Sequence, residues 1–336
     1  MNSIKMRQLG NSQVRVSELG LGCASLAGVG SSVSDSDARA TLNAALDAGI
    51  SYFDTAPFYG YGRSERLVGD ALRKAEAPIQ LSSKVGRLLK PCAEPQVADS
   101  GWPDALPMQP HYDYSYDGVM RSVEDSLQRL GLASMDIALI HDIDIYTHGK
   151  DIQKSMMATA MSGGYKALAE LRSAGVIKAV GLGVNENQVC IEALQQGDWD
   201  CFLLAGRYTL LEQSALDELF PACEKAGTSI IIGGPFNSGI LVGGSTYNYD
   251  AAPADVMQRV SCIQQVCAAH NVELAAAALQ FTLRSSLVSS VIPGPRSAAE
   301  FASLLAWYEA SIPDSLWSDL QSEGLLRADA PTRLEP

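Results

Sequence analysis

The segment Ser51-Tyr-Phe-Asp-Thr-Ala-Pro-Phe-Tyr-Gly60 decides the fold that we expect for this chain. Its first residues form a short apolar run, which predicts a buried strand that ends at Asp54. The turn that follows contains proline and glycine and carries Tyr59. Polar residues at the C-terminal ends of strands in a parallel barrel point to one shared active-site face. The segment therefore predicts one strand of such a barrel, with two polar side chains at its functional end.

Two other apolar runs end in the same way. The run Ile79-Gln-Leu-Ser-Ser-Lys84 ends on a lysine, and the run Asp136-Ile-Ala-Leu-Ile-His141 ends on one of only four histidines in the chain. If these strands belong to one barrel, their terminal side chains meet those of the first strand at its active-site face.

These four residue types suit proton transfer. A lysine at the end of a buried strand must find an anion or lose its charge, and Asp54 is a suitable counter-ion for Lys84. An ammonium near Tyr59 should favour the phenolate and lower a pKa that is about 10 in isolation, which makes Tyr59 a usable general acid and base. Each residue alone has a plainer structural reading, with Asp54 as a turn cap and His141 as a hydrogen-bonding core residue. Four such residues at successive strand ends favour the catalytic reading.

Strand-like runs alternate with amphipathic helical patterns along the whole chain. A count of eight favours a closed α/β (β/α)₈ TIM barrel, which needs about 250 residues plus insertions, over an open sheet. No boundary suggests a second domain, so residues 1–336 are expected to form a single barrel domain. The predicted strands lie near 18–22, 51–54, 79–84, 136–141, 177–182, 201–205, 229–233 and 288–292. The predicted helices lie near 35–48, 64–74, 116–130, 155–173, 187–196, 214–226, 254–269 with 274–284, and 297–309.

Additional segments flank or interrupt this pattern. The Gly-Asn turn within residues 7–17 predicts an N-terminal β-hairpin that plugs the bottom of the barrel, and residues 313–323 predict an extra C-terminal helix. Residues 86–115 are expected to form a long irregular loop over the active-site mouth, whose aromatic residues could make a substrate wall. The glycine-rich residues 237–249 are long enough to close over a ligand or to serve as a connector.

Composition limits the possible partners and compartments. The net charge of −13 makes a nucleic acid or an anionic membrane an improbable partner. The N-terminal residues lack the apolar core of a secretory signal, and no apolar stretch of about 18 residues predicts a membrane span, so we expect a cytoplasmic protein. Seven cysteines without a C-x-x-C pair favour reduced thiols, and no metal site is expected. The partner expected is a small-molecule substrate, and the protein is expected to be a monomer or a small homo-oligomer.

The signature segments Phe53-Asp54-Thr-Ala-Pro-Phe-Tyr59-Gly, Ser83-Lys84-Val and Leu139-Ile-His141-Asp142 resemble those of the aldo-keto reductase superfamily. The resemblance runs from the hairpin to the last helix. It implies a (β/α)₈ barrel that uses a nicotinamide cofactor without a metal. It also implies that Tyr59 is the acid and base, that Lys84 lowers its pKa while paired with Asp54, and that His141 orients the substrate oxygen.

Within the superfamily, the chain looks most like the aldose 1-dehydrogenases, such as L-fucose, D-threo-aldose and L-galactose dehydrogenases, and is similar to pyridoxal 4-dehydrogenase. The supporting segments are Tyr59-Gly-Tyr-Gly-Arg-Ser-Glu65, the run from Tyr116 to Gly131, and His141-Asp-Ile-Asp144. Both implied reactions oxidise a cyclic hemiacetal to a lactone. Oxidation of a free aldose is the leading interpretation, formation of 4-pyridoxolactone is the alternative, and a dinucleotide-binding regulatory subunit without turnover is a further one.

The resemblance also suggests cofactor contacts, with departures from the family pattern. Gly183-Val184 stands where many members have Ser-Asn, so Asn185 is the candidate for holding the carboxamide. Ala205, and Gly233 or Gly234, replace the usual glutamine and stacking aromatic residue. The turn from Ile292 to Glu300 resembles the family's phosphate-binding turn, and a helix N-terminus suits an anion. Its candidate contacts are Pro293, Gly294, Arg296 and Glu300.

The cofactor and the substrate remain open between alternatives. A carboxylate at Glu300 opposes a 2′-phosphate, which favours NAD over NADP, whereas Arg296 favours NADP. A pocket for a sugar substrate requires polar loop residues, and a pocket for pyridoxal requires aromatic side chains that stack on its ring. The polar candidates are Asp142, Asp144, His148 and Arg207, and the aromatic candidates are Phe58, Trp102 and Tyr112.

Overall fold

A computed structural model describes residues 4–93 and 101–333 of the chain. Its central sheet consists of eight parallel strands in the order β14-β11-β10-β9-β8-β5-β4-β3. A parallel bridge between Leu19 and Val291 joins the two ends of this order. The expected (β/α)₈ barrel is therefore confirmed. The strands are β3 Leu21–Gly22, β4 Tyr52–Asp54, β5 Gln80–Val85, β8 Ile137–His141, β9 Ala179–Val184, β10 Cys201–Ala205, β11 Ser229–Gly233 and β14 Val288–Ile292.

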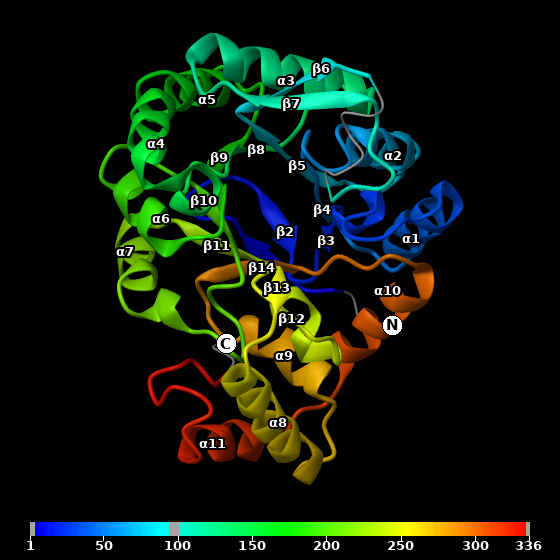
Figure 1. The fold of residues 1–336 in the computed structure, drawn as a ribbon, viewed down its shortest axis with the longest axis vertical. Helices are drawn as coiled ribbons and strands as arrows, with labels where there is room; N and C mark the ends of the chain where they lie inside the picture. Colours follow the sequence, from blue (N-terminus) through cyan, green and yellow to red (C-terminus); the bar gives the residue numbers. More distant parts are fainter. Residues whose placement is uncertain (1–3, 94–100, 334–336) are drawn as a thin grey trace.

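Helices surround the ring of strands (Figure 1). They connect successive strands, as the βα alternation predicts, and the additional C-terminal helix α11 packs near α8. The α-helices are α1 Asp35–Asp47, α2 Arg63–Leu72, α3 Tyr116–Leu130, α4 Ile145–Thr159, α5 Tyr165–Ser173, α6 Asn187–Leu194, α7 Leu219–Ala226, α8 Ala254–Ala269, α9 Leu274–Thr282, α10 Ala298–Glu309 and α11 Asp314–Ser322.

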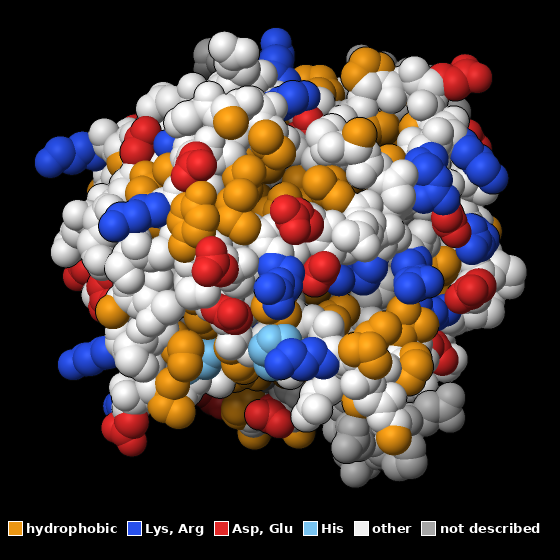
Figure 2. Space-filling model, turned by 90° about the horizontal axis from the view of Figure 1, so that it is seen from above, with side chains coloured by type: hydrophobic (Ala, Val, Ile, Leu, Met, Phe, Trp, Pro, Cys, Tyr) orange, Lys and Arg blue, Asp and Glu red, His pale blue; other side chains and the backbone are white. Residues whose placement is uncertain are grey.

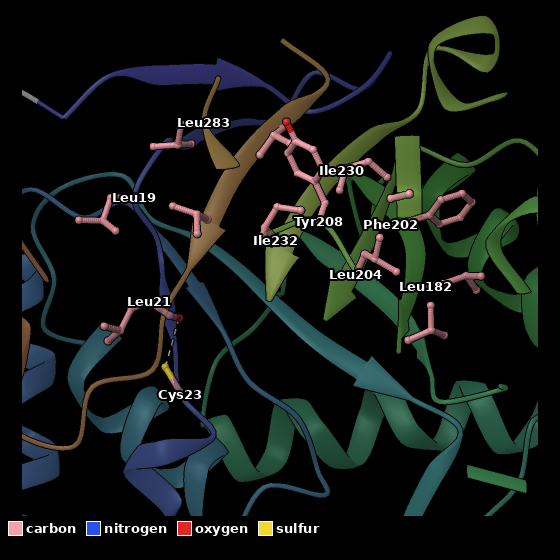
Figure 3. Close-up of a cluster of buried hydrophobic side chains, with 14 of the residues drawn as sticks. Leu19, Leu21, Cys23, Leu182, Phe202, Leu204, Tyr208, Ile230, Ile232 and Leu283 are labelled. Atoms are coloured by element: carbon pink, nitrogen blue, oxygen red, sulfur yellow. Dashed lines mark hydrogen bonds between the residues drawn. The ribbon is translucent and has the colours of Figure 1, made fainter. Parts of the chain in front are cut away.

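Alternation along the strands separates two apolar cores. In β10, Phe202 and Leu204 belong to the large core between strands and helices, whereas Cys201 and Leu203 belong to a smaller inner core. Figure 3 shows part of the large core, where Leu182 and side chains of β10 and β11 lie together. The same alternation decides which strand-end residues point into the barrel.

The N-terminal hairpin closes one end of the inner core. Its strands are β1 Met6–Gln8 and β2 Arg15–Ser17, and Leu9, Val14 and Val16 are buried in that core. The amide of Gly10 donates to Ser229 Oγ at 2.6 Å, at the start of β11. The hairpin therefore lies at the N-terminal end of the barrel, as predicted, and leaves the C-terminal end for the site.

The helical region before residue 173 differs from the prediction. A helix was expected near 155–173, but α4 begins at Ile145 and meets α5 through a π-helical turn at Ala160–Gly164. The side chain of Asp144 accepts a hydrogen bond from the amide of Thr147 and starts the helix ten residues earlier. Gly149, with φ 71° and ψ 160°, interrupts the helical pattern.

The two long loops also contain secondary structure that the sequence did not indicate. Within 86–115, strands β6 Arg87–Pro91 and β7 Met108–Tyr112 form an antiparallel ribbon, which lies beside α3 in Figure 1. A two-stranded ribbon tolerates its prolines because both strands are edges. Within 237–251, a 3₁₀ segment, Asn237–Val242, precedes the short pair β12 Thr246–Tyr247 and β13 Asp250–Ala251. Pro95 lies outside the described residues.

On the face shown in Figure 2, basic and acidic side chains are interspersed. All seven cysteines are free thiols, and five of them are buried. Among residues 4–93 and 101–333, no helix combines the length and apolar character needed to cross a bilayer.

Arg7 fastens the hairpin to the barrel. Its guanidinium donates to Glu18 Oε1 at 2.6 Å and to three main-chain oxygens at 2.7–2.9 Å, those of Leu283, Ser285 and Val288. These carbonyls lie just before β14 or at its first residue, so one side chain joins the first and last parts of the barrel.

We predict that Arg7→Ala lowers the free energy of unfolding by about 2–3 kcal/mol, because hydrogen bonds to a charged group are strong and Glu18 loses its cationic partner, although the hydrogen bond that it accepts from Tyr308 Oη remains. Arg15→Ala is the matched control, since Arg15 is an exposed hairpin residue whose side chain donates to Met6 O. Urea unfolding followed by circular dichroism measures both variants. Equal stability of the two variants would contradict the proposed fastening role.

Candidate active site

Alternation and register bring three predicted residues to the C-terminal end of the barrel interior. Asp54 is the last residue of β4, and His141 is the last residue of β8. Lys84 lies on β5 two residues beyond Ser82, which is paired with Asp54 in the neighbouring strand. All three are at least 95% buried. Gly183, opposite His141, leaves room for this group, since a β-carbon there would lie 3.1 Å from Lys84 Cε.

Lys84 and Asp54 form a buried ion pair. The Lys84 ammonium donates to Asp54 Oδ2 at 2.6 Å and to the Thr55 carbonyl at 2.9 Å, and Ser82 Oγ donates to Asp54 Oδ1 at 2.6 Å. Burial alone lowers the pKa of Lys84, but the charges of Asp54 and Tyr59 outweigh it, so this pKa is raised and the ammonium keeps its proton. The predicted counter-ion is therefore present.

Tyr59 lies over this pair. Its turn passes through Gly60 and Gly62, both with positive φ, before α2 begins. Lys84 Nζ lies 4.7 Å from the centroid of the Tyr59 ring, and the His141 ring centroid lies 5.9 Å away. Burial raises the pKa of Tyr59 above its ordinary value, and Lys84 acts in the expected direction by lowering it, but only partly opposes the effect of burial.

His141 is neutral. Burial, with Arg87 and Lys84 adding to it, lowers its pKa well below the ordinary value. Its carbonyl accepts a hydrogen bond from Tyr114 Oη at 2.7 Å, and its ring packs edge-on against Phe58 at 6.4 Å between centroids. A neutral imidazole keeps one N–H, so it is able to hydrogen-bond a substrate oxygen.

Asp142, the predicted substrate contact next to His141, is paired with a residue that the sequence analysis did not single out. Arg87, at the start of β6, forms an ion pair with Asp142 Oδ2, and its guanidinium carbon lies 3.9 Å from the centroid of Phe58. Burial raises the pKa of Asp142 to about 6, with Arg87 opposing the shift. The only sequence signal was the position of Arg87, three residues after Lys84 in the predicted mouth loop.

Aromatic side chains form a wall beside Tyr59. Trp102 stacks on Tyr59 with ring centroids 5.9 Å apart and meets Phe58 edge-on at 5.6 Å. The neighbouring Asp104 accepts hydrogen bonds from Ser32 Oγ and the Val33 amide, at 2.7 and 2.8 Å, which ties this segment to the loop after β3. The predicted aromatic candidates Phe58 and Trp102 are thus brought to the site.

Asn185 and Arg207 form a separate group. Asn185, just after β9, donates from Nδ2 to Asp142 Oδ1 at 3.3 Å, and its amide donates to Asp144 Oδ2 at 2.8 Å. Arg207 donates to the Asn185 carbonyl at 2.8 Å and to Asn248 at 3.2 Å. Arg207 therefore links the turn between β12 and β13 to the segment just after β9.

The predicted phosphate turn lies after β14 and leads into α10. Ser297 is the N-cap of α10, and Glu300 accepts a hydrogen bond from the Arg296 amide at 2.8 Å. The side chain of Arg296 binds the loop after β3 through Ser31 and the Val29 carbonyl. Pro293 and Gly294 pack against the same loop region, where the Gly22 amide donates to the Pro293 carbonyl at 3.0 Å. A helix N-terminus and an arginine at the C-terminal face of the barrel fit an anionic nucleotide.

Comparison with known proteins agrees with this geometry. The family model described as "Aldo/keto reductase family" matches residues 18–323. Pyridoxal 4-dehydrogenase from Microbacterium luteolum is 45% identical, with 97% of this chain and 99% of that protein covered. D-threo-aldose 1-dehydrogenase from a Pseudomonas species is 36% identical, with 92% and 94% covered.

A solved structure supports the same assignment. The holo form of an aldo-keto reductase from Bacillus halodurans superposes with a TM-score of 0.75 at 25% identity, with 97% of this chain and 98% of that chain covered. The family match over most of the sequence, the two close relatives and the barrel architecture agree. The chain therefore belongs to the aldo/keto reductase family, and it is an oxidoreductase.

Proposed function

We propose that this protein oxidises a cyclic hemiacetal to a lactone, with a nicotinamide dinucleotide as the hydride acceptor. The observation that carries the proposal is the ion pair of Lys84 and Asp54 beneath Tyr59, next to a neutral His141. Family membership and the holo neighbour imply a nicotinamide cofactor. The presence of all four polar residues favours turnover over a purely regulatory role.

In the proposed step the hydroxyl of the hemiacetal loses its proton and its carbon loses a hydride, which leaves the carbonyl of the lactone. Tyr59 takes the proton as general base, and Lys84 stabilises the phenolate that this requires. His141 donates a hydrogen bond to the same oxygen and orients it. The turn from Pro293 to Glu300 with the start of α10 is the proposed site for the cofactor phosphates, and the nicotinamide would supply the hydride acceptor.

The substrate that we propose first is pyridoxal, which reverses the order given by the sequence. The 45% identical relative is named pyridoxal 4-dehydrogenase, and the wall of Phe58 and Trp102 beside Tyr59 suits a flat aromatic ring. Free aldoses are the second candidate, because the 36% identical relative is a D-threo-aldose 1-dehydrogenase and the polar pair of Arg87 and Asp142 suits sugar hydroxyls.

We infer that NAD is preferred over NADP. Glu300 places a carboxylate at the proposed phosphate turn, where it opposes an additional phosphate. The Arg296 side chain is already bound to Ser31 and Val29, so it is not free to favour that phosphate without losing these contacts.

The first prediction concerns Tyr59. Tyr59→Phe should lower kcat by about 10²–10⁴-fold, since it removes the proton acceptor, while dinucleotide binding is retained. Reduced-cofactor absorbance is followed with NAD⁺ or NADP⁺ and with pyridoxal, L-fucose, L-galactose or D-arabinose, and binding is followed by fluorescence. Tyr116→Phe, a tyrosine that hydrogen-bonds Glu170 away from the site, is the matched control and should keep full activity. Unchanged turnover in Tyr59→Phe would contradict the proposed role of Tyr59 as general base.

The second prediction concerns pH. The active form of a general base is deprotonated, and burial holds the pKa of Tyr59 above its ordinary value. The kcat/KM for oxidation should therefore rise with pH between about 7 and 10, by up to about tenfold per pH unit where proton transfer limits the rate. A flat or falling profile over this range, with the fold intact by circular dichroism, would contradict the role of Tyr59.

The third prediction concerns cofactor choice. Glu300→Gln keeps the hydrogen bond to the Arg296 amide but removes the charge, so it should lower the NAD/NADP ratio of kcat/KM by about tenfold, equal to about 1.4 kcal/mol. Glu309→Gln, at the other end of α10, is the control. An unchanged ratio in Glu300→Gln would refute the assignment.

A further inference from the structure

We propose that Asp142 recognises a second hydroxyl group of the substrate, close to the oxygen that loses its proton, and that Arg87 positions the Asp142 carboxylate for this contact. The inference rests on the proposed function and names the feature of the substrate that this site selects. Asp142 is a specificity residue in this proposal, and Arg87 is a positioning residue.

The first argument is the place of the carboxylate. Asp142 follows His141 directly, and its backbone has φ 49°, a left-handed conformation that is uncommon for residues other than glycine. Its Oδ2 lies 3.3 Å from His141 Nε2. If His141 Nε2 holds the reacting oxygen, the Asp142 carboxylate flanks that position, because both are within about one hydrogen-bond length of the same nitrogen. A second substrate hydroxyl beside the reacting oxygen is therefore within reach of Asp142.

The second argument is that neighbouring side chains hold the Asp142 carboxylate in place. Arg87 is 5% exposed and its guanidinium lies between the rings of Phe58 and Tyr112, 3.9 and 5.0 Å from their centroids. It binds Asp142 Oδ2, and Asn185 Nδ2 donates to Oδ1 at 3.3 Å. The Asp142 side chain is 13% exposed, against 6% for Arg87. The carboxylate is therefore the member of the pair that a substrate reaches.

The third argument concerns energy. A buried ion pair is weak evidence for stability, because desolvation of both charges offsets much of their attraction. Two oriented contacts on one partly exposed carboxylate, from Arg87 and Asn185, instead preorganise a hydrogen-bond acceptor at fixed distance from His141. Such preorganisation favours the binding of a ligand group that donates a hydrogen bond to this carboxylate.

The chemistry of the acceptor defines the substrate class. An ionised carboxylate only accepts hydrogen bonds, so it favours a neutral hydroxyl that donates, and it disfavours a hydrogen atom, a carbonyl or an oxyanion at that position. A site built to pair with a substrate hydroxyl rejects the analogue that lacks it, because the polar group is then left unpaired. An aldose meets this requirement with its hydroxyl at C2, next to the oxidised carbon, and pyridoxal meets it with its protonated ring hydroxyl, which lies one carbon further away.

The test compares each substrate with the analogue that lacks this single hydroxyl: L-fucose with 2-deoxy-L-fucose, and pyridoxal with 3-deoxypyridoxal. For the class that is turned over, the unmodified protein should prefer the hydroxyl-bearing substrate by about 10- to 100-fold in kcat/KM. Asp142→Asn and Arg87→Met should reduce this preference to about threefold, mainly through KM. In both variants, kcat/KM should fall less for the deoxy analogue than for the hydroxyl-bearing substrate.

Controls separate this role from a structural one. Arg87→Lys keeps the charge and should retain part of the preference that Arg87→Met loses. Arg129→Met breaks another buried pair, with Glu65, and should leave the preference unchanged. Equal losses on both substrates, or an absence of preference in the unmodified protein, would overturn the proposal. Lack of turnover with every compound in the panel would instead count against the proposed function.

Discussion

The buried charge of Lys84 is the constraint on which the rest of the site depends. An ammonium removed from water is tolerated only with compensating partners, and this one has the Asp54 carboxylate and the Thr55 carbonyl. Asp54 is in turn held by Ser82, on the strand that carries Lys84. The pair therefore requires β4 and β5 to be adjacent and in register, and this register also sets where the turn that carries Tyr59 leaves the barrel.

The two ends of the barrel have different tasks. At the N-terminal end the hairpin fills the interior with Leu9, Val14 and Val16, and Arg7 ties it to the segment before β14. At the C-terminal end the strands end at polar residues, and the proposed catalytic side chains occupy the interior there. This division is the usual one in a (β/α)₈ barrel, where one end contributes stability and the loops of the other contribute function.

Segments far apart in the sequence meet at the mouth of the barrel. The loop after β3 receives Asp104 from the insertion that carries Trp102, and it receives Arg296 from the turn before α10. The segment that carries the aromatic wall and the proposed nucleotide turn are therefore both hydrogen-bonded to the same loop. The ribbon of β6 and β7 supplies Arg87, which joins Phe58 to Asp142. The geometry of the proposed substrate site thus depends on the insertion within 86–115 and on the loops after β3 and β14, as well as on the strands.

The sequence by itself determined the strands, their number, the closing hairpin and the four polar residues at or just after strand ends, because hydrophobic periodicity and strand-end chemistry are local properties. It did not determine the ribbon within 86–115, the early start of α4 or the partner of Asp142. Pairing of Arg87 with Tyr112, or of Arg87 with Asp142, joins residues distant in sequence and leaves no periodic signal. The net pKa of Tyr59 was also beyond it, since the balance between burial and the nearby ammonium exists only once the barrel has closed around both.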